Sequence, residues 1–321
     1  MHIEKANKAF INYLDSYRKE NLSGHLLAPV DYIFSLGGKR LRPAISIWIN
    51  QLYNGNLSNV LPAALAIEMF HNFSLVHDDI MDEAPLRRGK ATVHHKWNTN
   101  TAILSGDAML VLVYEILSDL EENKLKPALK LFNYAAINVC EGQQLDMDFE
   151  NQNSIKLDDY ITMIGLKTGD LLGASFALGA LLANASKEDI DHLYSFGKNT
   201  GIAFQLQDDI LDLYGEQGKV GKQVGGDIIA NKKTCLWIRA FEKANKEQKS
   251  KLEQMVLEVD SEKKVSLAKI LFDVLKVKED ADAIKSQYQK EAFEHLEKID
   301  LDPSKKNMIK DFALKLLTRE F

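Results

Sequence analysis

Two short runs of aspartate carry the clearest chemical signal in the sequence. They are DDIMD at 78–82 and DDILD at 208–212. On a helix, residues i and i+4 lie on one face a turn apart, so Asp78 and Asp82 would project together with Asp79 beside them. Three carboxylates in so small a space repel one another, and the flanking residues are largely apolar. Both runs therefore need a compensating cation.

The donor chemistry of these runs favours a hard metal ion. Carboxylate oxygens without cysteine are typical ligands of Mg²⁺, which binds one or two carboxylates and completes its shell with water and substrate phosphate. Two such runs on facing helices would hold a phosphate-bearing ligand between them. A pair of solvated helix ends is the alternative, and the matching apolar interiors of the two runs disfavour it. His77 is expected to be an ordinary hydrogen-bonded side chain and not a ligand.

Basic segments that contain glycine accompany both acidic runs. GGKRLRP at 37–43 places three cations behind two glycines, which let the backbone approach an anion, and Arg42 can bind two phosphate oxygens. RRG at 87–89 follows the first run, and Lys167-Thr168 is expected at the head of a helix rich in Gly and Ala. The basic residues after the second run are Lys219, Lys222, Lys232 and Lys233. Each segment alone would be an ordinary solvated surface, so the inference rests on the pairing with the acidic runs.

The sequence contains no recognisable covalent nucleophile. It has no Gly-x-Ser-x-Gly elbow, no P-loop and no dinucleotide-binding glycine motif after a strand. This pattern indicates chemistry in which metal ions and basic side chains stabilise a leaving diphosphate, without a covalent enzyme intermediate.

Helices are the elements that must position these residues. Apolar residues recur every four positions before both acidic runs: Leu65, Met69 and Phe73 before the first, and Ile202, Leu206 and Ile210 at the second. Such helices pack on other helices, which predicts a large all-α domain. Residues 241–321 are expected to form exposed amphipathic helices on one side of the bundle. A separate C-terminal module is the alternative, disfavoured because no flexible linker precedes it.

The loops that join these helices are expected at glycine-, proline- and asparagine-containing segments. They are predicted at 37–43, 83–91, 151–155 and 215–231.

Composition bounds the class of protein. The 321 residues are 45% hydrophobic and 27% charged, with a net charge of −6, which is typical of a globular chain without overall affinity for nucleic acid. Two cysteines exclude a disulfide scaffold and a multi-cysteine metal site. The first ten residues lack an apolar signal core. The longest nearly uncharged apolar run, 171–186, is shorter than the roughly 20 residues of a membrane span. We therefore expect a cytoplasmic protein without stable membrane insertion.

Taken together, the motifs resemble those of the trans-isoprenyl diphosphate synthases, also called the polyprenyl synthetase family. The resemblance covers roughly residues 35–240, and its motifs are GGKRLRP (37–43), DDIMD (78–82), RRG (87–89), GQQLD (142–146), KTG (167–169), FQLQDDILD (204–212), and GK, GGD and NKKT between 221 and 234. It implies a single domain over 1–321, an isoprenoid-synthase helical bundle around a deep central cavity, usually a homodimer.

The resemblance also implies a role for each matching residue. Asp78, Asp82 and Asp208 would bind three Mg²⁺ ions on an allylic diphosphate, supported by Asp79, Asp209 and Asp212. The cations on that diphosphate would be Arg87, Lys167, Lys222 and Lys232. The isopentenyl diphosphate pocket would comprise Lys39, Arg42, His71 and Arg88. Cavity and supporting residues would be Thr168, Gln205, Gln143 and Asp146.

The implied reaction is ionisation of the allylic diphosphate, condensation and elimination, and its product length depends on the cavity floor. Phe73 lies five residues before Asp78, about 7.5 Å along a helix axis, and in the family a bulky aromatic here is typical of short products. The small Ser74 beside it, and the lack of a two-residue insert in the motif, favour the C20 product geranylgeranyl diphosphate over C15 farnesyl diphosphate. Met69 and Phe70 lie one turn deeper and could also cap the cavity.

Two other functions remain open at this point. A class I terpene cyclase shares the first motif, but it normally has a different second motif and needs no isopentenyl pocket. A non-catalytic partner subunit of a synthase usually lacks an intact aspartate triplet, whereas both triplets are intact here.

Overall fold

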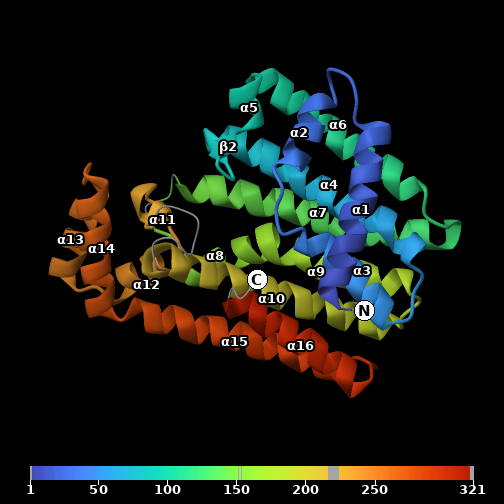
Figure 1. Ribbon diagram of the computed structural model, residues 1–321. Helices are drawn as coiled ribbons and strands as arrows, with labels where there is room; N and C mark the ends of the chain where they lie inside the picture. The colour runs from blue at the N-terminus through green and yellow to red at the C-terminus, as the bar shows by residue number, and fades with distance from the viewer. Residues whose placement is uncertain (1, 151, 153, 216–223, 319–321) are drawn as a thin grey trace. The chain divides into compact units, whose positions relative to one another are not determined.

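The computed structural model describes residues 2–150, 152, 154–215 and 224–318 (Figure 1). Helices make up most of this part of the chain. Its strands are the two-residue segments β1 (Leu86–Arg87) and β2 (Lys90–Ala91), which pair antiparallel. The all-α prediction is confirmed, and the loop expected at 83–91 contains this short hairpin.

The chain divides into two compact units. Unit 1 comprises residues 1–137, 171–194 and 299–301, and unit 2 comprises residues 138–170, 195–298 and 302–321. The single domain over 1–321 and the deep central cavity stay predictions.

Unit 1 is built from α-helices around α4. Its helices are α1 (Ile3–Asn21), α2 (Ala28–Ser35), α3 (Leu41–Leu52), α4 (Leu57–Met81), α5 (Val93–Lys96), α6 (Thr99–Ser118), the first part of α7 (Glu122–Glu150), most of α9 (Asp170–Leu182) and the start of α10 (Lys187–Tyr214). Helix α4 packs against α3 and α6, and its apolar residues are buried over most of its circumference. An amphipathic surface helix would show a single apolar stripe instead, so α4 is the core helix of this unit.

Local signals at both ends of α4 position the first aspartate motif. The helix begins after Asn56, whose side chain accepts a hydrogen bond from the Ser58 backbone N–H at 3.0 Å. It ends at Met81 because Glu83 adopts a left-handed conformation with φ of 49°. The Asp82 N–H still bonds to the Asp78 carbonyl at 2.9 Å. The motif therefore occupies the last turn of a buried, well-anchored helix.

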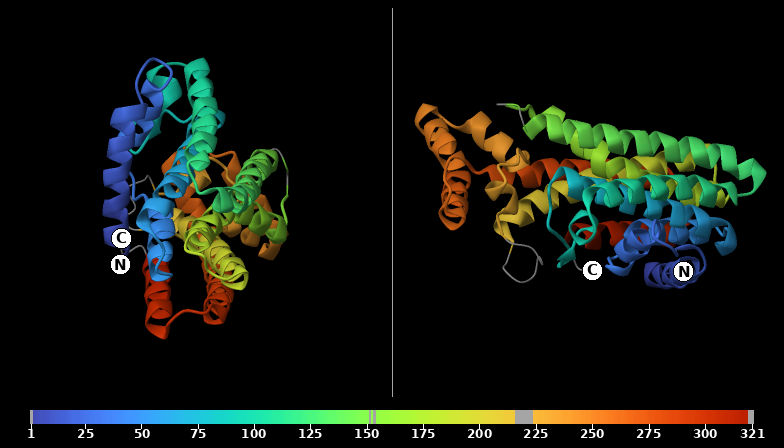
Figure 2. Two further views of the ribbon diagram at one scale, coloured as in Figure 1. Left: turned by 90° about the vertical axis from the view of Figure 1, so that its right-hand side faces the viewer. Right: turned by 90° about the horizontal axis from the view of Figure 1, so that it is seen from above.

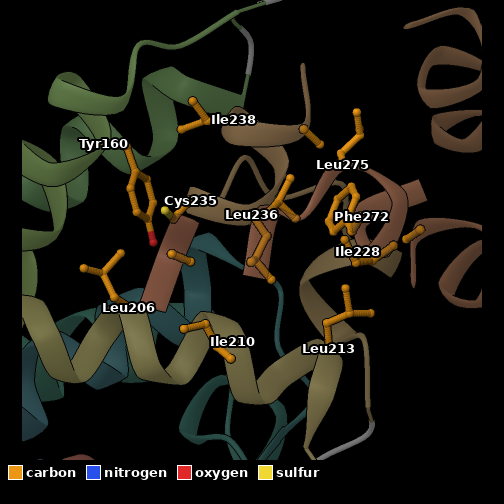
Figure 3. Close-up of a cluster of buried hydrophobic side chains, with 14 of the residues drawn as sticks. Tyr160, Leu206, Ile210, Leu213, Ile228, Cys235, Leu236, Ile238, Phe272 and Leu275 are labelled. Carbon is orange, nitrogen blue, oxygen red and sulfur yellow. The ribbon is translucent and has the colours of Figure 1, made fainter. Parts of the chain in front are cut away.

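Unit 2 contains the remaining helices. They are the rest of α7 and α10, α8 (Leu157–Ile164), the π-helical segment η1 (Gly165–Gly169), α11 (Gly226–Ile229), α12 (Cys235–Lys243), α13 (Lys246–Val256), α14 (Ser261–Leu275), α15 (Val277–Lys298) and α16 (Pro303–Thr318). Figure 3 shows side chains of α8, α10, α12 and α14 pointing toward one another, among them Tyr160, Leu206, Leu236 and Phe272. This cluster includes Leu206, Ile210 and Leu213 of α10, so it is the hydrophobic core on which the helix of the second aspartate motif packs.

The C-terminal helices are part of this unit. Phe272 and Leu275 of α14 and Ala281 of α15 belong to the same buried cluster as Tyr160. Helices α15 and α16 lie side by side, as the red helices of Figure 2 show. Helices α13 and α14 and the first part of α15 therefore share a hydrophobic core with the helix that carries the second motif.

Two helical stretches are long and apolar enough to cross a membrane by length and composition alone. In Leu157–Leu182 the most apolar window is 78% buried, which is typical of a core helix. In Thr99–Ser118, which is α6, it is 39% buried.

Candidate active site

The first aspartate motif is held by an ion pair with the hairpin that follows it. Asp79 is 2% exposed, and its carboxylate accepts two hydrogen bonds from Arg87, from Nε at 2.8 Å and from Nη2 at 2.7 Å. Arg87 Nη2 also lies 3.8 Å from Asp78 Oδ2. Burial raises the pKa of Asp79, and the guanidinium opposes part of that rise. Arg87 therefore reaches the two leading carboxylates of the motif.

Asp78 and Asp82 are the more accessible carboxylates of this motif. The Asp78 side chain is 20% exposed, and Asp82 is exposed at the helix end. Asp78 lies in the last turn of α4 and Asp82 is the residue that caps its C-terminus, one turn further along, as the sequence spacing predicted. Their oxygen donors fit a hard divalent cation.

Glycines 37 and 38 make room for a cation near the predicted isopentenyl diphosphate pocket. Arg88 Nη1 donates a hydrogen bond to the Gly37 carbonyl. A Cβ atom on Gly38, whose φ is 127°, would lie 2.8 Å from the Arg88 guanidinium. Both glycines have a positive φ that favours glycine, and Gly38 is also needed for the close approach of Arg88.

Arg42 and His71 form the second part of this pocket. Arg42 Nη1 lies 3.4 Å from His71 Nε2, and the buried Arg42 Nε has no hydrogen-bond partner among the residues that the structure describes. Burial lowers the pKa of His71 well below its usual value, and the positive charge of Arg42 adds to this effect. A neutral imidazole beside an arginine with an unused donor fits the binding of an anion. Lys39 is exposed in the same loop, and its carbonyl accepts a hydrogen bond from Asn7.

Arg40, the third cation of the 37–43 segment, turns into the core. It is 6% exposed and adopts a left-handed backbone conformation with φ of 48°. Its Nη1 lies 2.6 Å from Glu68 Oε1, and its Nη2 donates to the Phe34 carbonyl at 2.6 Å. The sequence grouped Arg40 with Lys39 and Arg42 behind the two glycines and gave it no role in the pocket, and the structure pairs it with Glu68 instead. The missed signal was Glu68, a carboxylate within an apolar run of α4.

The predicted chain-length residues lie on one stretch of α4. The Phe73 ring lies 5.5 Å from that of Phe70, centroid to centroid, and 4.7 Å from that of His77. Met69 is fully buried, and Ser74 Oγ donates to the His71 carbonyl at 2.9 Å. A small Ser74 therefore leaves Phe73 as the large side chain of this turn.

The second aspartate motif, on α10 in unit 2, is held by neutral donors. Asp209 is 3% exposed and accepts hydrogen bonds from the Tyr160 hydroxyl and, at 3.3 Å, from Gln205 Nε2. Burial raises the pKa of Asp209 to about 8, against the effect of these bonds. Asp212 Oδ2 accepts from the Asp227 backbone N–H at 3.0 Å, so this carboxylate holds the start of α11. Asp208 is partly buried on the same stretch of α10.

The predicted unit 2 cation Lys167 lies in the π-helical turn η1. Its Nζ lies 2.6 Å from Asp146 Oδ2, and the neighbouring Thr168 Oγ1 donates to Gln205 Oε1 at 3.3 Å. A Cβ atom on Gly142 would lie 2.4 Å from the Lys167 backbone nitrogen, so glycine lets α7 approach this turn. Lys167 and Thr168 were predicted at the start of a helix. They instead precede α9 in a segment continuous with α8.

The loop after the second motif is only partly described. Lys232 is partly buried, and its backbone N–H bonds to the Asp227 carbonyl at 2.8 Å. Lys219 and Lys222 lie outside the described residues. Gln143, a predicted cavity residue, is partly buried on α7. Within the described part of the chain, no three His, Cys, Asp or Glu side chains converge as a ready-made metal site.

Comparison with known proteins identifies a family. A model of the family described as polyprenyl synthetase matches residues 23–274. A short chain isoprenyl diphosphate synthase of Methanocaldococcus jannaschii is 40% identical over 252 residues, which cover 78% of this chain and 75% of that protein.

Two solved structures extend the similarity. A geranylgeranyl pyrophosphate synthase has a TM-score of 0.93 and 36% identity over the whole of both chains. A geranylgeranyl pyrophosphate synthase of Corynebacterium glutamicum, in complex with isoprenyl diphosphate and magnesium, has a TM-score of 0.86 and 25% identity, covering 99% of this chain and 98% of that one.

Proposed function

The chain belongs to the polyprenyl synthetase family and is an isoprenyl diphosphate synthase, and we propose that it makes geranylgeranyl diphosphate from isopentenyl diphosphate and allylic diphosphates. The observation that carries the substrate assignment is the pocket of Arg42, His71 and Arg88, in which a buried guanidinium N–H of Arg42 has no partner within the described ranges of the chain. Burial of such a donor costs free energy unless an anion accepts its hydrogen bond.

Magnesium is the proposed metal, with Asp78, Asp82 and Asp208 as direct ligands of three ions. Exposed or partly buried carboxylates on α4 and α10 support this choice, and the C. glutamicum relative was solved with magnesium. Asp79, Asp209 and Asp212 support the two motifs through their contacts with Arg87, Tyr160 and the backbone of Asp227. When bound, Mg²⁺ would supply positive charge for the departing diphosphate.

The basic residues divide between two diphosphates. Arg87, Lys167, Lys222 and Lys232 are proposed to hold the allylic diphosphate, and Lys39, Arg42, His71 and Arg88 the isopentenyl diphosphate. The ion pairs of Arg87 with Asp79 and of Lys167 with Asp146 orient two of these cations before substrate binds. Pre-oriented charge stabilises a leaving group without reorganisation during the reaction.

The proposed reaction proceeds by loss of diphosphate. The allylic C–O bond breaks, and the diphosphate leaves with the electron pair. The isopentenyl double bond then attacks the allylic cation, and a proton passes from the new cation to the departed diphosphate. Thr168 and Gln205, which are hydrogen-bonded to each other, would orient their dipoles toward the carbocation. No dedicated protein base is needed in this scheme.

Phe73 is the proposed floor that stops growth at C20. Its bulk, the small Ser74 and the buried Met69 support this assignment. Phe73→Ala is expected to lengthen the product because the growing chain would pass the vacated ring. Chromatography of dephosphorylated products tests this, and an unchanged chain length would reject it. A C15 product from the wild-type enzyme would instead identify a farnesyl diphosphate synthase.

A homodimer is the proposed assembly. The exposed apolar side chains of α6 and α7 support it: Ile103, Leu104, Val111, Tyr114, Tyr134 and Ile137, all more than 40% exposed. A second copy would cover this face and remove its apolar area from water. Light scattering should show a dimer for the wild type and a monomer for Val111→Asp. A wild-type monomer would reject the proposal. The cytoplasmic location stays a prediction.

The purified chain tests the function directly. It should elongate dimethylallyl, geranyl or farnesyl diphosphate with isopentenyl diphosphate and Mg²⁺, and excess EDTA should abolish turnover. Hydrocarbon release from an allylic diphosphate alone would indicate a terpene cyclase. Inactivity of the chain by itself would indicate a non-catalytic subunit.

A further inference from the structure

The imidazole of His77 occupies a notch in helix α6. A Cβ atom on Gly106 would lie 2.2 Å from His77 Nε2 and 2.6 Å from Cδ2, and the three heavy atoms nearest to that position all belong to the imidazole. His77 Nε2 also lies 3.3 Å from the Ile103 carbonyl oxygen. Because a carbonyl only accepts, this bond requires the proton on Nε2. The notch therefore fixes the position of the ring through its shape and one polar contact.

The other side of the same imidazole contacts Phe73. The two rings lie 4.7 Å apart, centroid to centroid, with an interplanar angle of 61°, an edge-to-face arrangement. Phe73 and His77 are four residues apart on α4 and so share a face. Phe70 contacts Phe73 from the preceding turn at 5.5 Å. Phe73 is thus enclosed between two rings, and His77 in turn rests on Gly106.

We infer that His77, seated on Gly106, is a positioning residue that sets product length by holding the ring of Phe73. The inference rests on the proposed function, in which Phe73 is the floor for the growing chain. A phenylalanine side chain changes position by rotation about χ1 and χ2, and those rotations are limited by what packs against the ring. Removal of the imidazole opens space into which Phe73 can turn.

Variants of His77 test the ring contact. His77→Ala is expected to shift the product distribution to chains one five-carbon unit longer. His77→Phe, which keeps a ring of similar size but loses the contact with the Ile103 carbonyl, is expected to keep the wild-type product. Chromatography of dephosphorylated products gives the readout. Unchanged product length in His77→Ala would overturn the inference, as would an equal shift in both variants.

A substitution on α6 tests the notch from the other side. Gly106→Ala should push the imidazole toward Phe73 and shift products to chains one unit shorter. In the His77→Ala background the same substitution should have no effect, because the atoms that its methyl group meets are gone. An equal shift in both backgrounds would show that the methyl group acts on the spacing of the helices, and would overturn the inference. Thermal unfolding identifies a variant that fails to fold, and the His77 variants then decide alone.

Phe73→Ala, assayed in parallel, separates this inference from the proposed function. A longer product from Phe73→Ala with no change in His77→Ala would reject the positioning role and leave the floor intact. No change in either variant would reject both.

Discussion

In both aspartate motifs the second carboxylate is the buried one: Asp79 is 2% and Asp209 is 3% exposed. Their compensation differs. Asp79 faces the guanidinium of Arg87 through two hydrogen bonds, whereas Asp209 faces the neutral Tyr160 hydroxyl and the Gln205 amide. The same sequence pattern is thus anchored by charge in the first motif and by neutral donors in the second. Loss of a partner should therefore have different consequences in the two motifs.

Loss of the first, more accessible carboxylate of a motif should have the largest effect on catalysis, and the effect should be similar in both motifs. Asp78→Ala and Asp208→Ala are each expected to lower kcat by roughly 100- to 1,000-fold, because each removes a proposed metal ligand that stabilises the leaving group. Steady-state kinetics with Mg²⁺ measures this. Glu253→Ala, at an exposed carboxylate of α13, serves as a control that should keep the wild-type rate. A near-normal rate in only one of the two variants would show that the two motifs do not contribute equally to catalysis.

Arg87→Ala should have the largest effect on stability. It leaves the Asp79 carboxylate buried without its cation, which we expect to cost about 2–3 kcal/mol of unfolding free energy, since Arg87 is partly exposed and water can replace it in part. Denaturant unfolding gives the value. Asp79→Asn added to Arg87→Ala should recover part of the loss, because the uncompensated charge is gone. No recovery in the double variant would contradict the charge argument.

Tyr160→Phe should cost less. It removes one hydrogen bond to Asp209, and because the buried carboxyl can take up a proton, the expected loss is about 1 kcal/mol. The same denaturant measurement on both variants tests the comparison directly. A loss larger than that of Arg87→Ala would reverse the proposed order of charge and neutral compensation.

The cation-rich surroundings of the first motif should also add a small acid sensitivity. The pKa of His71 lies well below 6.5 through burial and through the positive charges of Arg42, Arg88, Arg87 and Arg40. As the pH falls, the His71 imidazole takes up a proton in the unfolded chain before it does so in the folded protein. The unfolding free energy therefore has its full value above pH 6.5 and decreases as the pH drops below 6.5. His71→Gln should flatten this dependence between pH 5 and 7, as thermal unfolding at several pH values would show. An unchanged slope would exclude His71 as its source.

Sequence reasoning located the helices and motifs because their signals are local. The spacing of Asp78 and Asp82 implied that they lie one helical turn apart, and the structure places Asp78 in the last turn of α4 and Asp82 at its C-cap. The inward turn of Arg40 could not be predicted in the same way. Its neighbours Lys39 and Arg42 look equivalent in sequence, and the direction of Arg40 depends on Glu68, which lies far away in the chain. A lone carboxylate in an apolar run was the one available indication.

The partners of the second motif show the same limit. Tyr160 is separated from Asp209 by 49 residues, and nothing near either residue in the sequence indicates the contact. The π-helical turn at Lys167 was also missed, because an extra residue in one turn leaves the apolar pattern almost unchanged. Tertiary packing decides both features, and single-sequence patterns do not encode it directly.

The π turn η1 has a consequence for protein engineering. A π bulge holds one residue more than an α-helical turn, so deletion of a single residue between Gly165 and Gly169 would let the backbone close as a regular α-helix from α8 into α9. The helix would survive this deletion, and the side chains of α8 and α9 would keep their directions relative to one another, because the bulge takes up its extra residue within a single turn. A one-residue deletion here would thus change the directions in which Lys167 and Thr168 point while the helix that bears them stays intact.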